Sequence, residues 1–229
     1  HRRKKGRVRP ALPGVHSKMN PTSELFNFRT AGTALLVAAI VFMIGAFVAD
    51  YFRLPIPTQP LEKLQRIAND RPGWTAQAIL FPVVYLATAV LFALIAAKLP
   101  NARGLASAAA LLVAVGFLCW LVISIDRLQL GAKAAELIRT YDPAAPPEVM
   151  VNFSWVFWAN TLCILAALAL MGAALALAGV LPTLGWVVMG TAVASALIAT
   201  LIWRDWPPFM SYVIVLVLAV GLARVGHSG

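Results

Sequence analysis

Six long apolar stretches dominate this sequence and limit the folds open to it. They cover approximately residues 30–49, 76–97, 103–125, 154–178, 180–203 and 206–223. Each is close to the ~20 residues that a helix needs to cross ~30 Å of hydrocarbon. Backbone groups in lipid need partners within the protein, and the alternating pattern of barrel strands is missing. We therefore predict an all-α, polytopic membrane bundle of about six transmembrane helices.

Composition supports a membrane protein. Hydrophobic residues make up 61% of the chain and charged residues 12%, whereas a soluble domain has about 25% charged residues. We expect one transmembrane domain over residues 30–225. It follows a basic arm at residues 1–29 and precedes a short tail at residues 226–229. Because the chain starts with His1 and has Met19 ahead of the first apolar stretch, we expect residues 1–18 to be either an upstream extension or a trimmed fragment.

The distribution of charge predicts the orientation. Of the 19 Lys and Arg residues, eight precede the first apolar stretch; such clusters stay on the cytoplasmic side. Both termini are then cytoplasmic, and tryptophans at the outer ends of the spans would form an interfacial belt: Trp74, Trp155, Trp158, Trp203 and Trp206. For the net charge of +10, contact of the arm with anionic lipid is a better explanation than nucleic-acid binding.

Two outer segments share a pattern. Asp50 and Asp126 each end a span that runs outward, and an Asp-Pro element precedes re-entry at Asp70-Arg71-Pro72 and at Asp142-Pro143. Between them, apolar residues recur on one helical face: Leu61, Leu64 and Ile67 in the first segment, and Leu128, Ala132, Ala135 and Ile138 in the second. We predict two short amphipathic outer helices, which either cap the bundle or cover a cavity.

Small residues predict close helix packing in the fourth and fifth spans. Pairs spaced four residues apart let helix backbones approach each other in lipid. They are Ala169 with Ala173, Gly172 with Ala176, and Gly190 with Ala194.

Residues that would carry chemistry are absent from the spans. The histidines are His1, His16 and His227, all in the tails, so no histidine-ligated haem is expected within the membrane. Cys119 and Cys163 lack companion ligands, which argues against a metal site and favours free thiols. The serines in the spans have no histidine or lysine that would activate them as nucleophiles. We therefore expect no enzyme activity and no cofactor.

A few polar residues in or beside the spans are candidate ligand contacts. Asn160 lies six residues into the fourth span, next to Thr161. An amide in lipid needs an interhelical partner, for which Tyr85 and Ser195 are candidates. These residues either join helices or line a small polar cavity. Asp50 and Asp126 are either solvated helix ends or a carboxylate pair at the outer mouth.

Two short motifs resemble a known family. The first span opens with Arg29-Thr30-Ala31-Gly32, and the turn after the second span reads Lys98-Leu99-Pro100-Asn101-Ala102-Arg103. With the six-span length, they resemble an uncharacterised bacterial membrane family known as a domain of unknown function, over about residue 27 to the end. The resemblance implies the cytoplasmic membrane of a bacterium and carries over no functional residue.

Two functions fit these observations. The first is an accessory or structural subunit that packs against a larger membrane complex or forms a homo-oligomer, because buried charge is scarce in the spans. The alternative is a small carrier or ligand-sensing bundle with a polar cavity around Asn160.

Overall fold

The computed structural model describes residues 27–53, 55, 57–147, 149 and 154–225, which form helices and connecting turns. The helices are α1 (Phe28–Ala46), α2 (Pro60–Asn69), α3 (Arg71–Ala97), α4 (Arg103–Arg139), α5 (Ser154–Leu177), α6 (Pro182–Leu197) and α7 (Pro208–Arg224). Short 3₁₀ turns cover Asp50–Phe52 and Pro100–Ala102, and a π-helical turn, Ile198–Trp203, extends α6.

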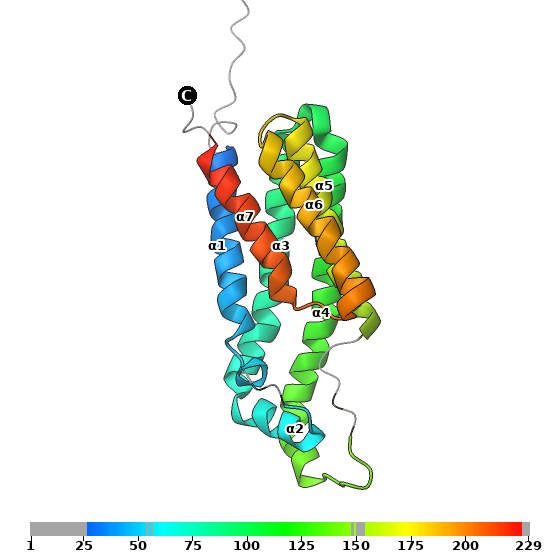
Figure 1. Ribbon diagram of the computed structural model, residues 1–229. Coiled ribbons are helices and arrows are strands. Elements are labelled where there is room, and N and C mark those ends of the chain that lie inside the picture. The colour runs from blue at the N-terminus through cyan, green and yellow to red at the C-terminus, as the bar shows by residue number, and fades with distance from the viewer. Residues whose placement is uncertain (1–26, 54, 56, 148, 150–153, 226–229) are drawn as a thin grey trace, which may run out of the picture.

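Six apolar helices run alternately up and down through the bundle, so that α1 begins and α7 ends at the same end (Figure 1). Five of the helical segments are long and apolar enough to cross a membrane. The sixth, α7, has 17 residues, at the lower limit of the ~17–25 that spanning helices use. The all-α prediction is confirmed, and the chain has the architecture of a multi-pass membrane protein.

Local signals explain where several helices begin. The Asn27 side chain accepts a 2.8 Å hydrogen bond from the Thr30 N–H and caps α1. Asp70 caps α3 in the same way, through a 3.1 Å bond from Gly73 N–H. Proline lies in the first turn of α2, α3, α6 and α7, where its missing N–H costs nothing. Gly179, at φ +70°, turns the chain between α5 and α6.

The structure differs from the sequence-based prediction in α4. We expected a span ending near Asp126 and a separate amphipathic helix after it, but α4 continues without a break over 37 residues to Arg139. The segment after Asp126 contains no proline, and its Ala, Leu, Lys and Glu residues favour helix. At 1.5 Å per residue α4 is about 55 Å long, so its end projects past the other long helices (Figure 1).

Small residues bring two pairs of helices into backbone contact. Gly32 of α1 lies against the backbone of α7 at Leu222 and Ala223. Between α5 and α6, a Cβ on Gly172 would lie 2.6 Å from the carbonyl oxygen of Gly185. The predicted packing role of Gly172 is therefore confirmed. Gly190 differs, because a Cβ there would meet no described atom within 4 Å.

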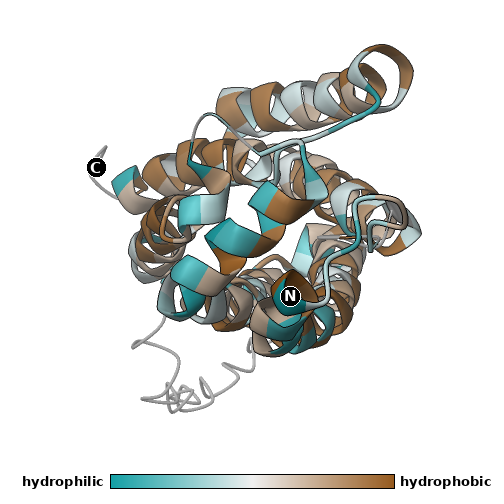
Figure 2. Cartoon of the chain, turned by 90° about the horizontal axis from the view of Figure 1, so that it is seen from below, coloured by the Kyte–Doolittle hydropathy of each residue, from teal (hydrophilic) through white to brown (hydrophobic). Residues whose placement is uncertain are grey.

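A small second core lies at the end of the bundle opposite the start of α1. It consists of the buried residues Ala49, Tyr51, Leu64, Ile67, Trp74 and Ala134. Leu64 and Ile67 form the apolar face that the sequence predicted for α2. In the view from this end, α2 lies across the bundle (Figure 2). The first outer helix is thus a capping helix that closes the bundle.

Candidate functional site

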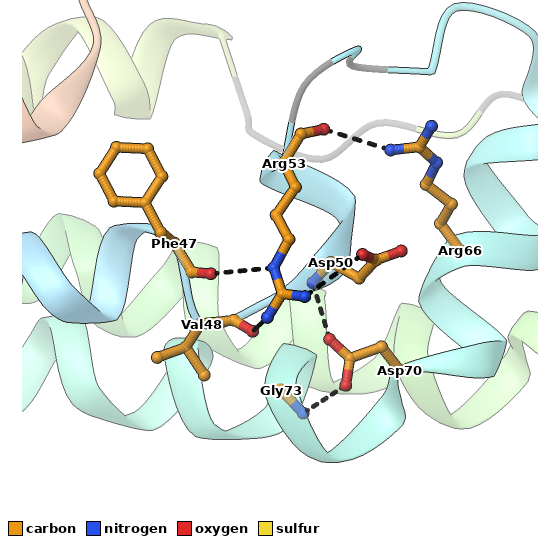
Figure 3. A network of polar contacts seen from close by, with 7 residues as sticks. All are labelled: Phe47, Val48, Asp50, Arg53, Arg66, Asp70 and Gly73. Carbon is orange, nitrogen blue, oxygen red and sulfur yellow. Dashed lines mark hydrogen bonds and ion pairs between the residues drawn. The ribbon is translucent and has the colours of Figure 1, made fainter.

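A polar network holds the end of α1 (Figure 3). Arg53 donates hydrogen bonds of 3.4 Å from Nε to the carbonyl oxygen of Phe47 and from Nη2 to that of Val48. These groups follow the last turn of α1, where carbonyls lack helical partners. The Arg53 guanidinium also forms a 3.7 Å ion pair with Asp50. Both charged side chains are about half exposed, so the pair itself contributes little stability.

Asp70 joins this network to the start of α3. Its Oδ2 accepts a 2.7 Å bond from the Asp50 backbone N–H, while Oδ1 accepts the capping bond from Gly73. Arg66 of α2 donates a 3.2 Å bond to the carbonyl oxygen of Arg53. The Asp-Pro element that the sequence repeats therefore has a structural role here: one carboxylate connects the turn after α1 to α3.

A buried arginine lies just inside this network. Arg127 of α4 is 2% exposed, and its Nη1 donates a 3.1 Å hydrogen bond to Oε1 of Gln77 on α3. The Gln77 amide nitrogen donates in turn to the carbonyl oxygens of Gly45, at 3.0 Å, and Ala46, at 3.1 Å. Gln77 therefore satisfies the last turn of α1 and a charged group of α4 at once, and links three helices.

Aromatic rings surround the Arg127 guanidinium. Its central carbon lies 5.1 Å from the ring centre of Phe52, 5.7 Å from Trp74 and 5.3 Å from Trp120. Trp74 also donates a 2.7 Å bond from Nε1 to the Arg127 carbonyl oxygen. Cation–π contacts strengthen when they are desolvated. Burial raises the pKa of the neighbouring Tyr51 hydroxyl, and the positive charge of Arg127 opposes this rise.

A second polar cluster lies deeper in the bundle, where α3, α4 and α5 meet. The Tyr85 hydroxyl faces Trp120 and Asn160, and the Oδ1 of Asn160 packs against Gly116 of α4. Among the described residues, four buried side-chain atoms make no hydrogen bond: Tyr85 Oη, Trp120 Nε1, Ser124 Oγ and Asn160 Oδ1. Such groups cost about 1–3 kcal/mol each when unsatisfied. They are the strongest candidates for polar ligand contacts.

The structure brings together some of the predicted site residues. Tyr85 and Asn160 are neighbours across α3 and α5, as expected. Thr161 is buried on α5, and Ser195 is buried on α6 with 9% of its surface exposed. Asp50 bonds within the network at the end of α1, and among the described residues it forms no hydrogen bond or ion pair with the half-buried Asp126. A carboxylate pair at the outer mouth therefore gains no support.

The tryptophans divide into two groups. Trp155 and Trp203 are exposed, and Trp158 is partly exposed, as an interfacial belt requires. Trp74 and Trp206 are instead buried, at 1% and 4% exposure. Their indole N–H groups bond inside the protein, that of Trp206 to Ser211 Oγ at 2.9 Å. These two residues differ from the belt prediction because Trp74 packs into the small second core and Trp206 packs into the main core of the bundle.

Sequence reasoning missed Arg127, Gln77 and Gly116. Two signals were available. Gln77 is the amide-bearing residue in the otherwise apolar stretch from Ala76 to Ala97, and Gly116, Trp120 and Arg127 recur on one face of α4 at helical spacing. The predicted span ended at Asp126, which left Arg127 in the segment after it. Cys119 and Cys163 are free thiols, as predicted.

Comparison with protein-family models, curated proteins and solved structures finds no match to this chain. A search of the described residues for groups of three or more His, Cys, Asp or Glu side chains suited to a metal ion also finds none.

Proposed function

We propose that the protein is a non-catalytic accessory subunit of a bacterial cytoplasmic membrane, which packs through α6 against a helix of a larger membrane complex. The observation that carries the proposal is the sparse coverage of α6 within the chain. In the segment Pro182–Trp203, which joins α6 and its π-helical turn, 28% of an apolar 18-residue window is buried, compared with 61% for Trp155–Leu177 of α5. A helix of the bundle so weakly covered has a large face available for another protein.

The uncovered face of α6 has the composition of a helix–helix contact. Gly190, Thr191 and Ala194 are all exposed on it, and Trp186 lies one turn before Gly190. Small residues spaced four apart allow close backbone approach, and a threonine hydroxyl can bond across to a second helix. The opposite face shows this chemistry in use, because Gly185 packs there against Gly172 of α5.

The π-helical turn that ends α6 supports the same conclusion. Residues Ile198–Trp203 adopt this geometry, and Leu201, Ile202 and Trp203 on it are exposed. π-helical turns occur frequently at functional sites. The turn widens the exposed apolar surface at the outer end of α6.

Charge supports an orientation with both termini in the cytoplasm. Residues 1–26 hold seven of the eight basic residues of the arm and lie outside the described part of the chain. Lys98, Arg103 and Arg224 lie at the same end of the bundle as the start of α1. Clustered Lys and Arg favour the cytoplasmic face and contact anionic lipid there.

Extraction from native membranes in a mild detergent tests the proposal. The wild-type chain is expected to migrate on a native gel in a stoichiometric assembly whose partners mass spectrometry identifies. Gly190→Leu should release it from that assembly. Gly104→Leu is the matched control, because a Cβ at Gly104 also meets nothing within 4 Å. A wild-type chain that runs alone or as a homo-oligomer, or a Gly190→Leu chain that keeps its partners, contradicts the proposal.

A second candidate function is favoured by buried polar atoms without a hydrogen-bond partner on Tyr85, Trp120 and Asn160, and on Ser124, one turn along α4 from Trp120. A carrier or ligand-sensing bundle would use them to bind a polar molecule. This function requires a path from water to the cluster, so Ser124→Cys in a background without Cys119 and Cys163 should react with a membrane-impermeant thiol reagent. If that cysteine does not react when the reagent is applied from either side of the membrane, this function is excluded.

A further inference from the structure

A groove on the membrane-facing surface runs between α3 and α4. Its volume is about 480 Å³. Alanines supply much of its wall, with Leu86, Val90 and Leu111 at its sides. Arg103 and Ser107 line it too, at the end where the Lys98–Arg103 turn joins the two helices. The groove therefore combines an apolar channel with a polar, cationic end.

The length of the groove matches one leaflet of a bilayer. Its lining on α4 extends from Arg103 to Ala114. Eleven residues at 1.5 Å each cover about 16 Å. This is roughly half of the ~30 Å hydrocarbon core. An acyl chain in the groove would thus lie in a single leaflet, with its headgroup at the level of Arg103.

Arg103 is placed to bind an anion. It is exposed in the first turn of α4 and forms no hydrogen bond or ion pair with any residue in the described part of the chain. No Asp or Glu occurs between Asp70 and Asp126, so neither helix supplies a counter-ion close in sequence. A guanidinium binds phosphate through paired hydrogen bonds. The Ser107 hydroxyl, one turn further along α4, can donate to the same headgroup.

A second groove provides an internal comparison. It lies between α5 and α6, has a volume of about 440 Å³, and is lined by Leu, Ala and Val alone. The two grooves are similar in size, and a cation with a neighbouring hydroxyl distinguishes the first. An apolar groove by itself accepts any lipid tail. The positive charge at the α3–α4 turn favours a lipid with an anionic headgroup.

We propose that the α3–α4 groove is a binding site for one anionic phospholipid, with an acyl chain along the alanines and the phosphate on Arg103. The occupant is a lipid because the groove opens along the hydrocarbon-facing sides of two spanning helices and its polar end coincides with their turn. This site is separate from α6, so the lipid-site proposal does not depend on the accessory-subunit proposal.

Native mass spectrometry of the full chain released from nanodiscs tests the site. The nanodiscs contain equal parts of phosphatidylglycerol and phosphatidylcholine. The wild type is expected to retain one phosphatidylglycerol in preference to phosphatidylcholine. Loss of one charge contact near the membrane is worth about 1 kcal/mol, which lowers this preference roughly five-fold in Arg103→Gln. Arg224→Gln, an exposed cation at the same end of the bundle, should leave the preference unchanged.

Filling the groove provides a second variant. Ala93→Leu places a larger side chain among the lining residues and should reduce retention of both lipids. Ala169→Leu in the α5–α6 groove is its control and should leave the retained phosphatidylglycerol in place. The proposal is overturned if Arg103→Gln keeps the wild-type preference for phosphatidylglycerol, or if Arg224→Gln loses as much of that preference as Arg103→Gln. It is also overturned if Ala93→Leu retains as much lipid as the wild type.

Discussion

Arg127 and Gln77, 50 residues apart in the sequence, are joined by a buried 3.1 Å hydrogen bond between the guanidinium of α4 and the amide oxygen of α3. The other end of the Gln77 amide bonds to the last turn of α1. A single side chain thus connects the first three spanning helices at the end of the bundle where α2 forms its cap.

Replacement of Gln77 should destabilise this end of the protein. Gln77→Leu removes one charge-assisted hydrogen bond and the two bonds that the amide donates to the Gly45 and Ala46 carbonyl oxygens of α1. A bond to a charged group contributes about 1.5–3 kcal/mol, so we expect a loss of that order in unfolding free energy. Denaturation in detergent micelles, followed by circular dichroism, measures it. Gln129→Leu, exposed on the same helix as Arg127, should change stability by about 0.5 kcal/mol or less.

Gly116 should not tolerate a side chain. A Cβ there would lie 3.0 Å from Cε1 of Tyr85 and 3.1 Å from Oδ1 of Asn160. Overpacking of a core typically costs about 1–3 kcal/mol, so Gly116→Ala should lower the thermal unfolding midpoint. At Gly104, where a Cβ meets nothing within 4 Å, the same substitution should be neutral or stabilising. Equal midpoints for the two variants would show that the helices at Gly116 can separate freely.

Within the polar network at the end of α1, Asp70 should be the carboxylate whose replacement has the largest effect. Asp70→Ala removes the cap of α3 and the acceptor of the Asp50 N–H. Loss of a helix cap costs about 1 kcal/mol. Hydrogen exchange by mass spectrometry should show faster exchange in residues 47–53 and at the start of α3. Asp142→Ala removes a carboxylate that accepts a local bond from the Ala144 N–H, and it should leave those segments unchanged.

Alkaline pH should lower the stability of the folded protein through Tyr51, which lies at the end of the bundle capped by α2. Burial raises the pKa of this hydroxyl above its usual value of 10.0. Between that value and the higher folded pKa, the unfolded state has released a proton that the folded state retains. Stability is therefore intact below pH 10 and falls as the pH rises above it. Unfolding measured from pH 8 to 11 should show a smaller loss for Tyr51→Phe than for the wild type; identical curves would contradict this account.

The sequence predicted the helices well because lipid imposes simple requirements. Apolar length located six helices, since the number of residues needed to cross a membrane can be read locally from the sequence. α2 was predicted from the spacing of Leu64 and Ile67, which also placed its buried face.

The contacts between helices were harder to predict because they join distant residues. Trp74 was expected at the membrane interface, but its indole bonds to Arg127, 53 residues away. The predicted span ended at Asp126, which left Arg127 outside it. A single sequence does not say which side of a continuing helix meets another element, so the aromatic surroundings of Arg127 became visible only in the fold.

Site-specific photo-crosslinking in native membranes tests the central claim, that α6 docks against another membrane protein. A photoreactive residue at position 194 lies on the uncovered face of α6, and one at position 111, an exposed position on α4, serves as the lipid-facing control. The account predicts a discrete protein adduct of one heterologous partner from position 194, abolished by Gly190→Leu, and none from position 111. Adducts with lipid alone at both positions, or with a second copy of this chain at position 194, would contradict it.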